Sequence, residues 1–200
     1  MLSLKLIQQQ ILQAKKLRVL GGMSQVKTPH SDPSMTLLNM SQYSGIVDYH
    51  PEELVITVKS GTTVKELNRI LAEKKQATLF VLPDNKNSTI GGAYAMGNSD
   101  LRDAVLGIKI IDGRGRLLNF GGQVMKNVAG YDVARLLVGS KGKMAVICEI
   151  SLKIIPESYA KNTTRNIKPK SQTKKTTPSK LKMQLEKDIK NIFDPLAVFV

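Results

Sequence analysis

The sequence predicts an α+β fold, and three observations support this prediction. Strand-like and helix-like apolar patterns both occur, but they mix without the strict alternation of a doubly wound parallel sheet. The longest apolar run, residues 144–155, has the composition of a strand and is closed by Pro156. Glycines and prolines separate short segments along most of the chain, as expected for a small mixed domain.

The first predicted element is a helix over residues 3–16, with Ser3 as its N-cap. Lys15 and Lys16 stand at its C-terminal end, where the helix dipole favours cations. Its apolar face is formed by Leu4, Ile7, Ile11 and Leu12. Short strands are then expected at residues 17–20, 37–40, 46–49 and 54–58.

The next predicted elements are a helix from about Thr63 to Lys74 and a hairpin. The apolar stripe of this helix is Val64, Leu67, Ile70 and Leu71. The hairpin pairs residues 105–111 with 117–120 around the turn 112–115. Asp132 is expected to cap a helix over 133–138 that ends at Gly139.

The polar composition changes sharply after Pro156. Residues 157–180 are rich in Lys, Thr, Ser and Asn, so this segment cannot bury enough apolar surface to order itself. A helix over 181–193 is expected next, with Leu181, Leu185, Ile189 and Ile192 in line. The predicted domains are therefore a folded unit over 1–156, a basic linker over 157–180, and a helix and tail over 181–200.

Composition places the chain among ordinary globular proteins. It has 200 residues and a hydrophobic content of 42%, enough for one domain with an appendage. The single cysteine, Cys148, excludes an internal disulfide and favours a reducing compartment. Gln8–Gln10 interrupts the N-terminal apolar pattern, so no signal peptide is expected, and no apolar run is long enough for a transmembrane helix.

The formal net charge of +14 is concentrated near the C-terminus. Residues 161–190 contain ten Lys or Arg and two Asp or Glu, which gives +8 there and +6 elsewhere. Such a tail can hold RNA, DNA or an acidic partner. A solvated tail is the favoured interpretation, because base stacking needs aromatic side chains and the segment has almost none.

Three glycine-containing loops are the candidate functional features. The first is Gly21-Gly22-Met23-Ser24 after a strand; the second runs from Pro83 to Gly97 and includes Thr89, Gly91 and Gly92. The third combines residues 127–132 with 139–142. Glycine lets a backbone approach a bulky ligand, and successive amides in a turn can bind phosphate.

These loops resemble a known family. MKNVAGYD at 125–132, followed by ARLLVGSKG and the strand ICEISLKIIP, is similar to the FAD-binding subunit of bacterial glycolate oxidases. Those subunits carry the PCMH-type FAD-binding domain of the vanillyl-alcohol-oxidase type. LRVLGGMS at 17–24, SGT at 60–62 and TIGG at 89–92 agree in the same order. The resemblance implies two small α/β subdomains within an α+β domain, and FAD as the cofactor.

The resemblance also implies the residues that hold FAD. The first loop would offer its amides to the diphosphate, the second would lie against the flavin, and the third, with the following strand, would hold the adenosine half. The implied contact residues are Gly21, Gly22, Met23, Ser24, Pro83, Thr89, Gly91, Gly92, Gly130, Asp132, Gly142 and Ile147. Each loop also has a simpler interpretation. The first loop is then an ordinary turn between strands, and the second is a helix packed closely on a strand. In the third, Asp132 is only an N-cap and the glycines are only turns.

The chain departs from the family pattern in several places. The large substrate, or cap, domain expected between Pro156 and Leu181 is missing, and about a dozen residues are missing near 97–101. Met23 and Ala145 stand where the family usually has glycine. The segment 192–197 again resembles the family, in which a final helix leads into an Asp-Pro pair.

The remaining motifs are weaker indications of function. Gly113-x-Gly115 lacks a third glycine and lies in a hairpin turn, so it is not a dinucleotide fingerprint. His30 and His50 are too isolated for a metal pair, and neither lies in the first loop, so FAD is expected to be noncovalent. Cys148 is expected to be buried packing rather than a nucleophile.

The resemblance leads to two functional hypotheses. The first is a FAD-binding subunit of a glycolate oxidase-like complex, oxidising glycolate or another 2-hydroxy acid to the 2-oxo acid. A partner FAD subunit and an iron–sulfur subunit are implied, with a cytoplasmic location, peripheral to the inner membrane through those partners. The second is a degenerate assembly subunit or remnant that keeps the fold without binding FAD. Gly91→Val or Gly92→Val is expected to lower flavin occupancy while preserving secondary structure.

Overall fold

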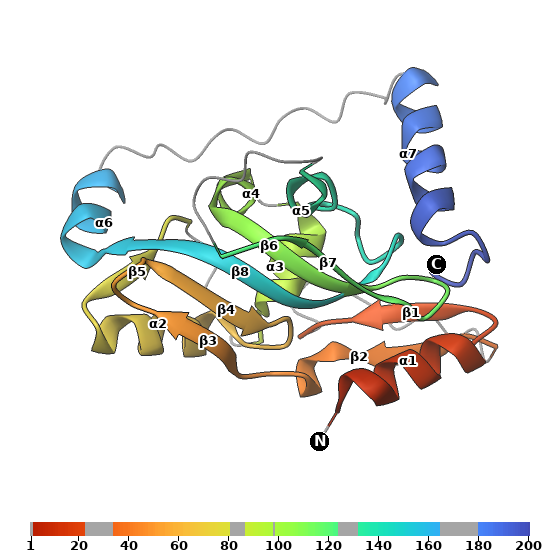
Figure 1. Ribbon diagram of the computed structural model, residues 1–200, viewed down its shortest axis with the longest axis horizontal. Helices are drawn as coiled ribbons and strands as arrows, with labels where there is room; N and C mark the ends of the chain where they lie inside the picture. The colour runs from red at the N-terminus through yellow and green to blue at the C-terminus, as the bar shows by residue number, and fades with distance from the viewer. Residues whose placement is uncertain (1, 23–33, 81–86, 98, 124–131, 165–179) are drawn as a thin grey trace.

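The computed structural model describes residues 2–22, 34–80, 87–97, 99–123, 132–164 and 180–200, except the side chains of 99 and 161–164 (Figure 1). The helices are α1 (Leu4–Gln13), η1 (Met40–Gln42), α2 (Val64–Glu73), α3 (Ile90–Met96), α4 (Ser99–Ala104), α5 (Val133–Leu136), α6 (Glu157–Thr164) and α7 (Lys180–Phe193). The strands are β1 (Leu17–Leu20), β2 (Thr36–Asn39), β3 (Ile46–His50), β4 (Val55–Lys59), β5 (Gln76–Thr78), β6 (Val105–Ile111), β7 (Leu117–Gly121) and β8 (Val146–Pro156).

The strands form two sheets of different size. The larger sheet has the order β3-β4-β8-β6-β7, with β5 pairing to the far end of β8, and its pairings are antiparallel. The smaller sheet is the parallel pair β1–β2. This arrangement confirms the predicted α+β class with two small subdomains.

The large sheet has a hydrophobic core on each of its faces. The first core lies between one face of the large sheet and α2, α3, α4 and α5; its largest members include Ile56, Leu67, Ile90, Tyr94, Ile150 and Leu152. The second core joins α1, β1 and β2 to the opposite face of the large sheet; it includes Ile7, Ile11, Leu17, Leu38, Ile111, Val146 and Cys148. Burying these side chains is the main favourable term that holds the two sheets together.

The C-terminal residues complete the small subdomain. The amide of Leu17 donates to the carbonyl of Val198 over 2.7 Å, and the amide of Val200 donates to Leu17 over 3.2 Å. Phe199 is fully buried in the second core. The carboxylate of Asp194 accepts from the amides of Val198 and Phe199 at 2.8 and 2.9 Å, which fixes the turn after α7.

Most expected elements of the first 156 residues are present, with small differences. Helix α1 ends at Gln13, so the two lysines predicted at its end lie beyond it, and Leu12 of its expected apolar face is 65% exposed. The structure adds β5 and α4, which the sequence analysis did not predict. Gly115 lies in the β6–β7 turn with φ of 73°, as expected for a hairpin rather than a nucleotide loop.

The C-terminal third differs more from expectation. Helix α6 occupies residues 157–164, at the start of the segment predicted to lack order. It continues directly from β8, whose last residue pairs with Gln76 of β5. Helix α7 is present as predicted, and three of its four aligned apolar residues are exposed. Within the described residues, no helix combines the length and apolar composition needed to cross a membrane.

Candidate nucleotide-binding site

The first two glycine loops are in direct contact. A Cβ placed on Gly21 would lie 2.9 Å from the hydroxyl oxygen of Thr89 and 3.6 Å from the Cα of Gly92. A Cβ placed on Gly22 would overlap the carbonyl group of Asn87. Because the neighbouring backbone leaves no room for a side chain, position 22 requires glycine. The first loop, which follows β1, therefore lies against the N-terminal end of α3.

Thr89 is the N-cap of α3. Its hydroxyl oxygen accepts from the amide of Gly92 at 3.1 Å. The amide of Ile90 donates to Thr62, and that of Gly91 donates to Ser60 over 2.8 Å. The first-turn amides of α3 are thus used within the protein, so α3 itself does not present them to a phosphate.

Gly91 and Gly92 have different surroundings. A Cβ on Gly91 would lie 2.6 Å from the Cβ of Ser60 and 2.8 Å from its carbonyl oxygen. This is the close helix-to-strand packing that was the simpler interpretation of the second loop. Among the described residues, a Cβ on Gly92 would meet only the Thr89 hydroxyl, at 3.0 Å. Gly92 therefore leaves open space where a ligand could approach, and Gly91 does not.

The third loop lies at the other end of α3. The amides of Gly139 and Lys141 donate to the carbonyls of Tyr94 and Ala95 over 3.0 and 2.9 Å. A Cβ on Gly97 would lie 3.1 Å from the Cα of Gly139, and both glycines have positive φ angles. A Cβ on Gly142 would lie 3.3 Å from Val19 of β1, so the loop borders the strand that carries the first loop. The three loops therefore surround one short helix.

Asp132 and Ile147 have structural partners of their own. Asp132 caps α5 by accepting from the amide of Arg135 at 3.0 Å, as predicted. Burial raises the pKa of the Tyr94 phenol, and the Asp132 charge raises it further; the phenol donates to the carbonyl of Ala134. Ile147 is buried in the first core. The other predicted contacts, Met23, Ser24, Pro83 and Gly130, lie outside the described residues.

Two serines missed by the sequence analysis stand out at these loops. The hydroxyls of Ser60 and Ser140 are buried and have no partner among the described residues. Ser60 packs against Gly91, and Ser140 lies within the third loop. A buried hydroxyl usually has a partner, so an orphan points to a missing ligand or water. Ser60 lies in the SGT run and Ser140 in the GSKG run, and these runs are the sequence signal by which both serines could have been found.

These observations fit the diphosphate part of a nucleotide. No hydrogen bond joins the amide of Gly21 or of Gly22 to any described residue. Two successive amides at a turn beside Gly92, without a partner among the described residues, are donors suited to phosphate oxygens. The orphan hydroxyl of Ser60 lies near the same end of α3, and that of Ser140 lies near its other end. No cluster of His, Cys, Asp or Glu suited to a metal occurs in the described part of the chain.

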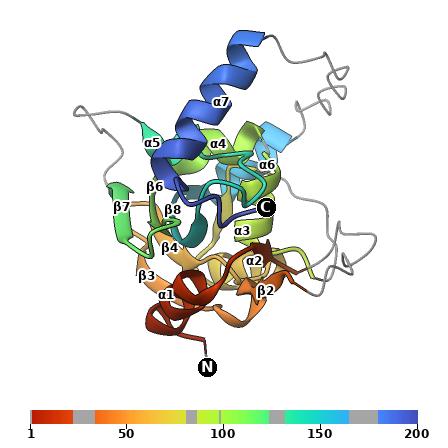
Figure 2. The same ribbon diagram turned by 90° about the vertical axis from the view of Figure 1, so that its right-hand side faces the viewer.

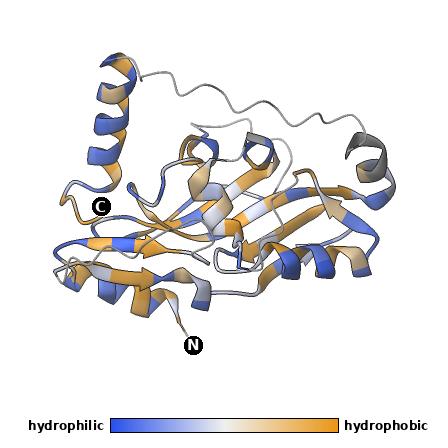
Figure 3. Ribbon diagram, turned by 180° about the vertical axis from the view of Figure 1, so that it is seen from behind, coloured by the Kyte–Doolittle hydropathy of each residue, from blue (hydrophilic) through white to orange (hydrophobic). Residues whose placement is uncertain are grey.

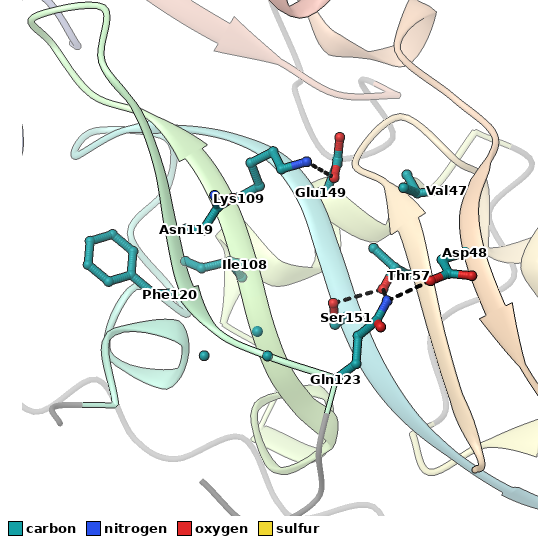
Figure 4. Close-up of a pocket in the computed structure, with 13 residues that line it drawn as sticks. Val47, Asp48, Thr57, Ile108, Lys109, Asn119, Phe120, Gln123, Glu149 and Ser151 are labelled. Atoms are coloured by element: carbon teal, nitrogen blue, oxygen red, sulfur yellow. Dashed lines mark hydrogen bonds and ion pairs between the residues drawn. The ribbon is translucent and has the colours of Figure 1, made fainter. Parts of the chain in front are cut away.

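A separate polar cavity of about 310 Å³ lies on the face of the large sheet away from α3 (Figure 4). Gln123 donates to Asp48 and Thr57 there, both at 3.1 Å. The hydrogen bond from Gln123 and then that with His50 hold the pKa of Asp48 below its usual value. None of the predicted loop residues lines this cavity, and Figure 4 shows the ring of Phe120 pointing away from it.

The buried carboxylate beside this cavity belongs to the fold. Glu149 pairs with Lys109 at 2.6 Å and accepts from the Tyr43 hydroxyl at 3.0 Å. Burial, followed by the Glu149 charge, raises the pKa of Tyr43. Because its partners are already satisfied, Glu149 ties the small subdomain to β8 rather than waiting for a ligand.

Comparison with known proteins finds similarity over much of the chain. A family model described as FAD binding domain matches residues 8–121. Glycolate oxidase subunit GlcE of Escherichia coli (strain K12) is 42% identical over 137 residues, which cover 64% of this chain and 39% of GlcE. Glycolate oxidase subunit GlcD of Bacillus subtilis (strain 168) is 33% identical over 129 residues, covering 59% of this chain and 27% of GlcD.

Other similar proteins extend the comparison. A D-lactate dehydrogenase of Anaerostipes hadrus is 27% identical over 128 residues, covering 60% of this chain and 27% of the enzyme. The chain thus spans two fifths or less of these relatives. A solved alkyldihydroxyacetonephosphate synthase aligns with a TM-score of 0.62 and 19% identity, over 76% of this chain and 29% of the synthase. At that identity the likeness establishes the fold.

Proposed function

This chain belongs to the FAD-binding domain family, and on that basis we propose that it is a FAD-binding subunit of a glycolate oxidase-like complex. FAD is the cofactor of the family. The single observation that supports the proposal best is the meeting of three glycine loops around α3. The similarity to two glycolate oxidase subunits and a D-lactate dehydrogenase favours oxidation of a 2-hydroxy acid, such as glycolate.

The residues proposed to hold FAD divide by loop. The amides of Gly21 and Gly22, continuing into Met23 and Ser24, would donate to the diphosphate. Gly92 would leave room for it, and Thr89 would fix the helix end behind it. The third loop and the start of β8 would border the adenosine half. Binding is proposed to be noncovalent, since neither histidine lies in the first loop.

When bound, FAD would supply the hydride acceptor for oxidation of the α-carbon of the 2-hydroxy acid. The protein's own contribution would be to bind and orient the nucleotide. No catalytic residue is assigned, because none of the described ionisable side chains lies at these loops in a cluster. A partner FAD subunit and an iron–sulfur subunit are proposed to complete the complex, in the cytoplasm or against the inner membrane through those partners.

The test is the flavin content of the purified chain. The proposal expects visible flavin absorbance, and release of the flavin into the supernatant after acid denaturation. Gly92→Val should lower occupancy, because its side chain fills the open space beside the first loop. Ala72→Val, at an exposed position of α2, is the matched control and should leave occupancy unchanged.

A second candidate is a subunit that keeps the fold but binds no FAD. The engaged first-turn amides of α3 favour it. Under this alternative the purified chain is colourless, gains no flavin when incubated with FAD, and keeps its circular dichroism spectrum. That result would reject the flavin-binding proposal while leaving a role in assembly.

A further inference from the structure

The two loops that meet at the candidate nucleotide site come from different parts of the fold. The first loop follows β1, which belongs to the small sheet. Thr89 and Gly92 belong to the start of α3, which packs on the large sheet through Ile90 and Tyr94. The shape of the site therefore depends on how β1 is held relative to the large sheet.

One edge of β1 is held by the C-terminal segment, residues 194–200. Leu17 and Phe199 form a parallel bridge, with hydrogen bonds from Leu17 to Val198 and from Val200 to Leu17. Figures 1 and 2 show this segment leaving the end of α7 and turning towards the small subdomain, and Figure 3 shows its hydrophobic residues. A sheet of only two strands is marginally stable in water, so residues 198–200 supply the third member that holds β1.

A buried carboxylate fixes the C-terminal segment in place. The side chain of Asp194 is fully buried and accepts from the amides of Val198 and Phe199 at 2.8 and 2.9 Å. The Nζ atom of Lys190 lies 3.6 Å from this carboxylate and donates to the carbonyl of Phe199 over 2.6 Å. Burying a carboxylate is costly unless it is paired and hydrogen-bonded, so these contacts act together.

The same residues join the C-terminal segment to the large sheet. The amide of Gly113, in the β6–β7 turn, donates to the carbonyl of Phe193 over 2.8 Å. A Cβ placed on Gly113 would overlap the carboxylate of Asp194, so the turn packs directly on it. The ring of Phe193 lies in the first core and meets Phe120 edge-on at 6.0 Å. Contacts therefore lead without a gap from the large sheet, through Asp194, to β1 and the first loop.

We propose that Lys190 and Asp194 are positioning residues for the nucleotide site. They hold β1 so that the amides of Gly21 and Gly22 lie against α3. This inference rests on the proposed binding of FAD and adds its dependence on the C-terminal segment. If the segment detaches, only a fraction of the molecules has the loop in place, and the apparent affinity for FAD falls by that fraction. The coupling is reciprocal, so bound FAD stabilises the pairing of β1 with residues 198–200.

The first test is titration of the full chain with FAD, followed by flavin fluorescence. Lys190→Met keeps the aliphatic stem and removes the charged donor, so the Kd for FAD should rise about tenfold. Lys190→Arg keeps a cationic donor and should restore most of the affinity. Lys187→Met makes the same change at an exposed position of α7 and should leave the Kd unchanged.

The second test is amide hydrogen exchange of the unsubstituted chain, with and without FAD. FAD should slow exchange at Leu17 and Val200. The amide of Lys74, which bonds locally to Leu71 at the end of α2, is the control and should not respond. A purely structural role of Lys190 would lower thermal stability but leave exchange at Val200 independent of FAD.

The outcomes separate this inference from the proposed function. Exchange at Val200 that does not respond to bound FAD overturns the inference, whether or not Lys190→Met folds. So does an equal Kd for Lys190→Met and the unsubstituted chain. Either result leaves flavin binding intact. A chain that binds no FAD at all overturns the proposed function, and this inference with it.

Discussion

At the level of single residues, Gly91 and Gly92 show why a motif alone does not define a contact. Both belong to the TIGG run, and nothing in that run distinguishes one from the other. Their roles differ because β4 continues into Ser60 directly beneath Gly91, while Gly92 lies on the side of α3 that meets the first loop. The sequence could predict that small residues were needed here. It could not predict which of them serves packing, since that depends on a residue some thirty positions earlier in the chain.

Gly91→Ala is expected to destabilise the fold, whereas Gly92→Ala is not. The new methyl group at Gly91 would press on the Ser60 backbone, and overpacking of this kind typically costs about 1–3 kcal/mol. At Gly92 the contact with Thr89 is offset by the better helix propensity of alanine. Urea unfolding of both variants checks this; equal midpoints would contradict the packing of Gly91 on β4.

Cys148 was expected to be buried, and it is, in the second core. Burial, followed by the Glu149 charge, raises the pKa of its thiol to about 12. At pH 8 roughly one thiol in 10⁴ is then ionised, so the native chain should react with a disulfide reagent only slowly. The reaction should become fast in denaturant. An equal rate for the native and the denatured chain would show that Cys148 on β8 is accessible to the reagent in the native state.

At the level of elements, the best sequence predictions combined a cap, a stripe and a stop signal. Thr63 begins α2, Thr89 begins α3 and Asp132 begins α5, each by accepting an amide of the first turn. Such hydrogen bonds join residues that are close together in the sequence, so they can be predicted from it. The strand β5 was missed because it exists only through pairing with the end of β8. Helix α7 was predicted, but the spacing of its apolar residues fits exposure as well as burial, so the sequence could not say which of the two applies.

Thr89→Ala and Thr63→Ala should have similar effects on stability but different effects on flavin binding. Each removes an N-cap, which typically costs about 1 kcal/mol. Only Thr89 also lies against the first loop, where its hydroxyl oxygen would be 2.9 Å from a Cβ placed on Gly21. Thermal unfolding and FAD titration measure the two effects. If Thr63→Ala lowers FAD affinity as much as Thr89→Ala, the site does not lie at α3.

At the level of the whole molecule, the second core joins the N-terminal and C-terminal parts of the chain. The small subdomain contains α1, β1 and β2, yet its strand β1 also pairs with Val198 and Val200. The resemblance at residues 192–197 anticipated a helix leading into Asp-Pro. It gave no information on where that segment docks, because the contact joins positions at opposite ends of the sequence.

Phe199→Ala should destabilise the chain by about 3–5 kcal/mol, the usual range for removing a fully buried phenylalanine. Leu196→Ala is the control: Leu196 is 67% exposed, so its loss should change stability by less than about 0.5 kcal/mol. Calorimetry compares the two. A small effect of Phe199→Ala would mean that the last residues do not hold the second core.

The pairing of Leu17 with Val198 and Val200 also constrains biosynthesis. The ribosome makes β1 long before residues 198–200, so one side of that strand lacks its hydrogen-bonding neighbour until those residues have left the exit tunnel. During that interval Phe199 does not yet cover Ile7, Ile11 and Leu17, and this apolar layer of the nascent polypeptide is open to aggregation.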